Sequence, residues 1–309
     1  MERYVETFTS SNVTIWFKLR EDIATSTATS TAYRLYYGNS NATAGSDAQL
    51  DMLENVFAKD YGEGGLAGLW HMDDGASPTA DSSGNGNNGT LVNGPAWQGT
   101  DGGQWDGQSS AKFSKGDHLS FDGTDDYVNC GNATSLANIG ISDFSLSAWY
   151  KTTSDDQIRI AGNQSYNGGG ASIMSWGVTT ENGKPAILYG KPGGEVILKY
   201  DADYSDGLWH YIVGTADRDG FMKIYVDGVL KNSLDISGDS AVSLNTTNNF
   251  TVGSHVGSGE FFPGQVDDVR RYNRVLTADE INAHYKRRMW VAADTVALDG
   301  NFAAAGAEQ

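Results

Sequence analysis

From Leu66 to about Tyr285, short runs of β-forming residues alternate with turns rich in Gly, Asn and Asp. The clearest runs are residues 143–150, 170–177, 195–200, 208–215, 222–228, 250–253 and 264–272. Short alternating runs at this spacing predict antiparallel strands packed into a sandwich or jelly roll. Asp227-Gly228, which joins two runs, is typical of a two-residue hairpin turn. The sequence therefore predicts an all-β protein built as an antiparallel β-sandwich.

The ends of the chain follow a different pattern. The sequence Gly62-Glu-Gly-Gly65 interrupts the chain, and β-forming runs at 13–19 and 31–37 precede it. Thr277-Ala-Asp-Glu280 is a capping box, which predicts one short helix near the C-terminal end. The expected division is 1–62 as a small β extension, 66–288 as the sandwich domain and 289–309 as a tail.

Charge and composition restrict the partners of this chain. A net charge of −18 over 309 residues argues against binding nucleic acid, because phosphates would be repelled. The same charge suits cation binding, although a merely solvated acidic surface explains it equally well. The single Cys130 cannot form an internal disulfide, so a buried, inert thiol is expected. Thirty-nine Gly against five Pro suit many tight turns.

The sequence shows neither a membrane-spanning segment nor a recognisable targeting signal. No apolar run is long enough to cross a membrane, and the first residues do not resemble a signal peptide. If the protein works outside cells, we expect that a signal was removed or that the chain leaves another way. Assembly into a virus particle released by lysis would be one such way.

An ordered set of motifs resembles the laminin-G-like jelly roll of the concanavalin A-like lectin and glucanase superfamily. The motifs are residues 69–75 with 81–90, then 119–128, 144–149, 207–215, 224–228 and 264–276. Residues 1–62, with Trp16-Phe-Lys-Leu19 and Tyr36-Tyr-Gly-Asn39, resemble the end of an uncharacterised β domain. Such a domain often precedes this jelly roll on prokaryotic surface proteins. The resemblance implies a concanavalin A-like fold for the central part of the chain.

Catalysis is not expected from the pattern of acidic residues. Glucanases of this superfamily carry alternating carboxylates on one strand, which places acid and nucleophile on one face. Here the pairs Asp125-Asp126, Asp155-Asp156 and Asp267-Asp268 are adjacent, so their side chains would point to opposite faces. No Gly-x-Ser-x-Gly elbow or metalloprotease helix appears either. We therefore predict that the protein is not an enzyme.

A calcium ion is the expected cofactor. The loop at residues 81–90 is dense in Asp, Asn and Gly, whose oxygens and turn-forming backbones suit a hard cation. In the family resembled, this loop and the closing strand at 266–272 approach each other and can hold calcium. The resemblance implies these ligands: Asp81, Asn85 and Asp267, with Asp268, Asp73 and backbone carbonyls in reserve. An alternative is that Asp81 caps its own turn while Asp267 pairs with Arg270 or Arg274.

Sugar binding would require exposed aromatic faces beside polar groups. Tyr166, Trp176 and Tyr189 are candidate platforms for a sugar ring. The alternative is that Trp176 and Tyr189 fill the sandwich core, where Trp149 and Trp209 are also expected.

Two functions remain open at this point. The first is a non-catalytic module for glycan binding or adhesion on a cell or virion surface. The second is a structural or decorating subunit of an extracellular assembly, such as a phage capsid or fibre, with no saccharide ligand. Its partners would be glycans or other surface subunits, including further copies of the chain joined through the termini.

Overall fold

The computed structural model describes residues 3–8, 13–17, 64–99, 117–163, 176–255, 259–282 and 284–285. Near the N-terminus, β1 (Arg3–Phe8) and β2 (Val13–Phe17) form an antiparallel pair. The strand β2 lies in the run predicted at 13–19. The run at 31–37 and the tail at 289–309 lie outside the described residues, so the three-part division stays a prediction.

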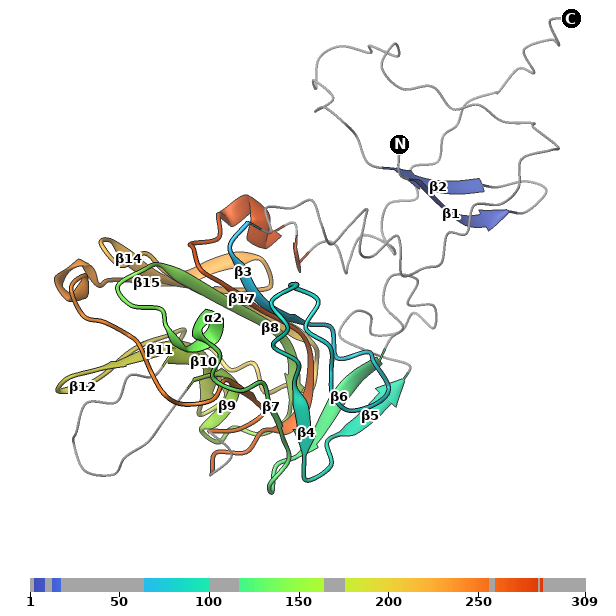
Figure 1. Ribbon diagram of the computed structural model, residues 1–309, viewed down its shortest axis with the longest axis horizontal. Coiled ribbons are helices and arrows are strands. Elements are labelled where there is room, and N and C mark those ends of the chain that lie inside the picture. Colours follow the sequence, from blue (N-terminus) through green and yellow to red (C-terminus); the bar gives the residue numbers. More distant parts are fainter. Residues whose placement is uncertain are drawn as a thin grey trace, which may run out of the picture.

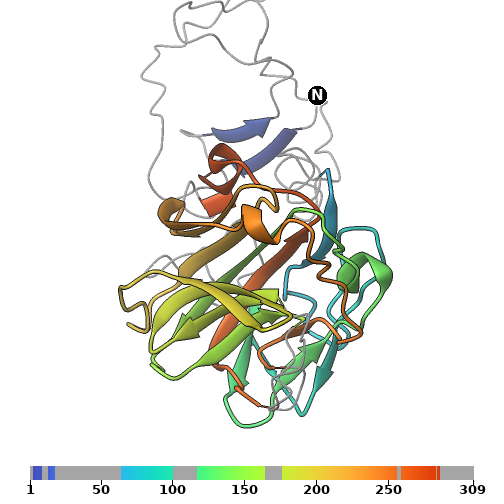
Figure 2. The same ribbon diagram turned by 90° about the vertical axis from the view of Figure 1, so that its left-hand side faces the viewer.

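Within these residues, two antiparallel sheets pack face to face (Figure 1; Figure 2). The seven-stranded sheet has the order β12 (Gly194–Lys199), β11 (Lys184–Lys191), β10 (Trp176–Glu181), β9 (Ile158–Gly162), β16 (Thr251–Val252), β7 (Tyr127–Asn129) and β4 (Thr90–Val92). The eight-stranded sheet has the order β15 (Val229–Asp235), β14 (Phe221–Val226), β13 (His210–Ala216), β8 (Phe144–Thr152), β17 (Pro263–Tyr272), β6 (Asp117–Asp122) and β5 (Ala96–Gly99). The remaining strand, β3 (Leu66–Trp70), pairs with β17. The predicted fold class, an all-β antiparallel sandwich, is confirmed.

The main core lies between the two sheets. On β8, Phe144, Leu146, Ala148 and Tyr150 alternate along the strand and belong to this core. The two sheets pack tightly at Gly214 of β13, where an added Cβ would lie 2.2 Å from the Ile187 Cδ1. Glycine is therefore needed there for lack of space between the sheets.

A second apolar cluster covers the other face of the eight-stranded sheet. Trp149 and Tyr211 belong to it, together with Ile281 from the C-terminal helical residues. Trp149 is therefore buried as predicted, but on the outer face of its sheet, and Trp209 is half-buried against the same cluster. Because this face is covered as well, β8 and β13 are buried on both sides.

Two local predictions are confirmed. The Glu280 backbone N–H donates to Thr277 Oγ1 (3.3 Å), and Glu280 Oε2 accepts from the Thr277 N–H (2.8 Å), which is the capping box. The turn at Asp227 and Gly228 has positive φ at both residues (54° and 74°), as a two-residue hairpin turn requires. These local signals depend on neighbours in sequence, so they can be identified without the tertiary structure.

Candidate functional site

The Asp81 carboxylate organises the Asp- and Asn-rich loop. Its Oδ1 accepts hydrogen bonds from the backbone N–H of Leu69 (3.0 Å) and of Ser83 (2.9 Å). Its Oδ2 accepts from the backbone N–H of Asn87 (2.8 Å). Asp81 therefore caps its own turn, as the alternative stated, and also joins this turn to β3 through the Leu69 N–H.

The rest of the loop continues along the same edge of β3. The Asn85 side-chain amide donates to the carbonyls of Leu66 (3.0 Å) and Ala67 (3.3 Å). Asn87 Nδ2 also donates to the Ala67 carbonyl, at 2.8 Å. Because β3 pairs with β17 through its other edge, these contacts satisfy backbone groups that would otherwise face outward. The loop thus covers an edge strand.

Asp267 and Asp268 lie on β17, on the opposite side of β3 from that loop. Asp267 is fully buried and lies opposite Trp149 of β8 in the strand register. Asp268 has a positive φ of 47° within an irregularity of β17 and forms an ion pair with Arg270 (3.0 Å). Arg270 thus contacts Asp268, and the alternative that Asp267 pairs with Arg270 or Arg274 stays a prediction.

Asp73 and Asp268 both act on His71. His71 Nδ1 lies 3.3 Å from Asp268 Oδ1. Burial lowers the pKa of His71, but the hydrogen bond and charge of Asp268, with the charge of Asp73, outweigh it, so the pKa is raised. This environment favours the protonated imidazole.

The predicted calcium ligands do not converge in the described part of the chain. The carboxylates of Asp73, Asp81, Asp267 and Asp268 do not form a common cluster with metal-ligand spacing, and the Asp81 oxygens already accept three N–H groups. Asp81 instead accepts hydrogen bonds along the edge of β3, and Asp268 forms an ion pair with Arg270. This arrangement does not resemble a single coordination sphere. The calcium site from these residues stays a prediction.

A different acidic cluster has metal-ligand spacing. Carboxylate oxygens of Asp122, Asp125 and Asp126 lie within 4.8 Å of one another, at the end of β6. Burial raises the pKa of Asp126, and the charges of Asp122 and Asp125 raise it further, although the hydrogen bond from the Asp122 N–H lowers it. Sequence reasoning missed this cluster because it weighed Asp125-Asp126 only as a catalytic pair. The spacing Asp-Gly-Thr-Asp-Asp was the available signal.

The aromatic residues proposed as sugar platforms have different positions. Tyr189 is fully buried (0% exposed), and its hydroxyl donates to Asp239 Oδ2 (2.6 Å). It therefore offers no exposed face and fills the core, as the alternative stated. Trp176 begins β10 and is paired with Tyr189 in the strand register, whereas Tyr166 lies outside the described residues.

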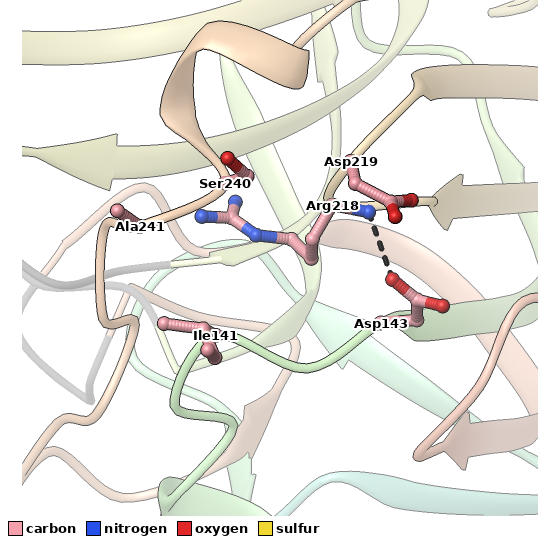
Figure 3. A pocket seen from close by; sticks show the side chains of 6 residues that line it. All are labelled: Ile141, Asp143, Arg218, Asp219, Ser240 and Ala241. Atoms are coloured by element: carbon pink, nitrogen blue, oxygen red, sulfur yellow. Dashed lines mark hydrogen bonds between the residues drawn. The ribbon is translucent and has the colours of Figure 1, made fainter.

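A pocket of about 440 Å³ opens where three connections meet at one end of the sandwich. We call it the Arg218 pocket, and Figure 3 shows the side chains that line it: Ile141, Asp143, Arg218, Asp219, Ser240 and Ala241. Pockets of this volume accommodate small ligands. Its lining combines carboxylates, a hydroxyl and apolar side chains, which is a chemistry suited to polar organic ligands.

A family model described as the concanavalin A-like lectin/glucanases superfamily, of the laminin-G type, matches residues 122–282. The match spans 161 of 309 residues, which is just over half of the chain, from the end of β6 into the C-terminal helical residues. The chain belongs to the concanavalin A-like lectin/glucanase superfamily. The resemblance found in the sequence is thereby confirmed. A search of curated protein sequences finds no match.

Solved structures share the fold of this superfamily member. The binding domain of Paraclostridial Mosquitocidal Protein 1 is similar with a TM-score of 0.53 and 15% identity, over 73% of this chain and 52% of that one. The receptor binding domain of botulinum neurotoxin D gives 0.51 and 19%, over 74% and 54%. The serotype D ligand binding domain in complex with N-acetylneuraminic acid gives 0.51 and 20%, over 73% and 51%. This chain thus spans about half the length of each of these structures.

Proposed function

We propose that this protein is a non-catalytic jelly-roll module that binds glycans, or adheres through them, on a cell or virion surface. The observation that carries the proposal is the Arg218 pocket in a domain of the lectin and glucanase superfamily. The similar structures are named as binding domains, and one of them holds N-acetylneuraminic acid. A saccharide is therefore the first ligand class to test.

The acidic residues of β17 favour binding over hydrolysis. Glycoside hydrolysis requires two carboxylates on one face, with a reacting bond between them. Asp267 is fully buried within the sheet, and Asp268 is engaged by Arg270 and His71. Neither side chain is placed to act on a bound sugar.

An extracellular location follows from this proposal. Among the described residues, no helix is both long and apolar enough to cross a membrane. A module displayed on a surface would meet glycans of other cells or particles. The second candidate is a decorating subunit with no saccharide ligand, which would join an assembly through its terminal residues. It is a separate prediction.

The proposal is tested with the purified chain on a glycan array, followed by isothermal titration of any hits. We expect saturable binding of at least one saccharide class, measured once in excess calcium and once with a chelator. A complete lack of saccharide binding in saturating calcium would contradict the glycan proposal. Size-exclusion chromatography of the same sample, showing a stable oligomer without glycan binding, would favour the decorating subunit.

A further inference from the structure

The Arg218 pocket is built from three connections of the eight-stranded sheet. Ile141 and Asp143 precede β8, Arg218 and Asp219 lie in the turn between β13 and β14, and Ser240 and Ala241 follow the short 3₁₀ helix η2 (Ser237–Asp239). Side chains from all three connections line the same pocket (Figure 3). Loops held by a rigid sheet are a common place for binding residues.

Arg218 fixes these connections to one another. Its side chain is buried (2% exposed), and Nη2 donates to the carbonyls of Asp239 and Val242, both at 2.9 Å. Its guanidinium lies over the Tyr189 ring, 4.9 Å from the centroid, and its backbone N–H donates to Asp143 Oδ1 (2.8 Å). The pocket wall is therefore held in place before a ligand arrives, which reduces the entropic cost of binding.

The charge around the pocket is predominantly negative. Asp143 and Asp219 line it, and a hydrogen bond to Asp219 raises the pKa of the adjacent Asp217, as do burial and the charge of Asp143. The carboxylates of Asp143 and Asp219 therefore line the pocket, whereas the guanidinium of Arg218 is buried: its Nη2 donates to two carbonyls, and its Nε and Nη1 are not exposed. An anionic ligand would be repelled by this arrangement.

Neutral sugars suit the same lining. The carboxylate of exposed Asp219 and the hydroxyl of Ser240 can accept hydrogen bonds from sugar hydroxyls. Ile141 is 59% exposed at the rim, and with Ala241 it offers an apolar surface to the C–H face of a sugar ring. Ligand sites commonly combine apolar surface with a small number of placed polar groups, and the pocket offers both.

We propose that the Arg218 pocket is a subsite for a neutral saccharide unit, and that it does not take sialylated or other acidic glycans. The inference rests on the proposed function and specifies its ligand class. The proposed ligand is neutral, whereas the similar serotype D structure holds N-acetylneuraminic acid, which is an acidic sugar.

The test compares neutral oligosaccharides with the same oligosaccharides carrying terminal sialic acid, by isothermal titration calorimetry. Wild type should bind the neutral forms, and terminal sialylation should weaken or abolish binding. Ile141→Arg should weaken binding about tenfold or more, because the bulky cation displaces the apolar contact. Asp219→Asn should weaken it as well, by removing a charged acceptor. Matched controls are Ile197→Arg on the edge strand β12 and Asp155→Asn on an exposed turn, and both should bind like wild type.

The outcomes separate this inference from the proposed function. If wild type binds saccharides and both pocket variants bind equally well, the subsite lies elsewhere and the general glycan proposal stands. Binding that is lost on enzymatic removal of sialic acid would overturn the neutral-ligand assignment. No binding of any saccharide by wild type would overturn the glycan proposal itself. Thermal melts check that each variant is folded. If Ile141→Arg does not fold, the isosteric variant Asp219→Asn still tests the pocket.

Discussion

His210, at the start of β13, is held between two carboxylates. Its Nδ1 lies 2.9 Å from Asp227 Oδ2, and its Nε2 lies 3.1 Å from Asp206 Oδ1. Burial acts to lower the pKa of His210, but the hydrogen bonds and charges of Asp227 and Asp206 outweigh it, so the pKa is raised. His210 therefore supports the fold, because Asp227 forms the hairpin turn that follows β14.

This pKa shift predicts a pH-dependent stability. A histidine whose folded pKa exceeds its unfolded value, about 6.5, stabilises the folded state fully below that value. The stabilisation is then lost as the pH rises through the folded pKa. Thermal melts of wild type and His210→Gln between pH 5 and pH 9 should therefore differ most at the acidic end. A constant difference across this range would contradict the ion-pair explanation.

Near Asp267 and Asp268, the regular alternation of side chains along a strand does not predict which contacts form. The sequence alternative paired Asp267 with Arg270 or Arg274, and the structure shows that Arg270 contacts the adjacent Asp268. The irregularity between Asp267 and Arg270, with positive φ at Asp268, shifts the register by which side chains alternate. Such a shift cannot be identified from adjacent residue types.

At the scale of elements, strands with a clear alternating pattern or a turn signal were predictable. The strands β8, β13, β14 and β17 lie where the runs were predicted. The strand β15 was not predicted, because its residues are largely exposed and give no apolar alternation. The strand β11 is buried along nearly its whole length, so it shows no alternation either. Tyr189 lies within it, and its burial agrees with the alternative that it fills the core.

The tight packing of Gly214 against Ile187 gives a prediction for β13 and β11. Replacing Gly214 by Ala would place a Cβ 2.2 to 2.9 Å from three side-chain atoms of Ile187. The sheets would have to separate, so we expect a loss of about 1–3 kcal/mol in the free energy of unfolding. Urea unfolding measures this change. Gly238→Ala is the control, because its added Cβ meets nothing within 4 Å, and an equal loss there would contradict the steric explanation.

At the scale of the whole molecule, the calcium prediction concerns stability. A cation bound only by the folded chain would raise the melting temperature, so a chelator should lower it. Asp81→Ala should abolish this response if the loop is the site, whereas Asp126→Asn should abolish it if the Asp122 cluster is. Because Asp81 also accepts three backbone hydrogen bonds, each variant is compared with and without chelator. If the chelator leaves the melting temperature of wild type unchanged, the calcium prediction is wrong.

The amino-acid sequence by itself determined the fold class, the capping box and the Asp227 hairpin turn, because strand periodicity and turn chemistry act between residues close along the chain. It also identified the superfamily through motifs in a fixed order. Only the tertiary structure decided which polar groups meet. The Arg218 pocket joins three connections that are far apart in sequence, and the loop at residues 81–88 lies on the opposite edge of β3 from Asp267. Contacts of this kind depend on strand order and register, which are set by packing of the whole sandwich.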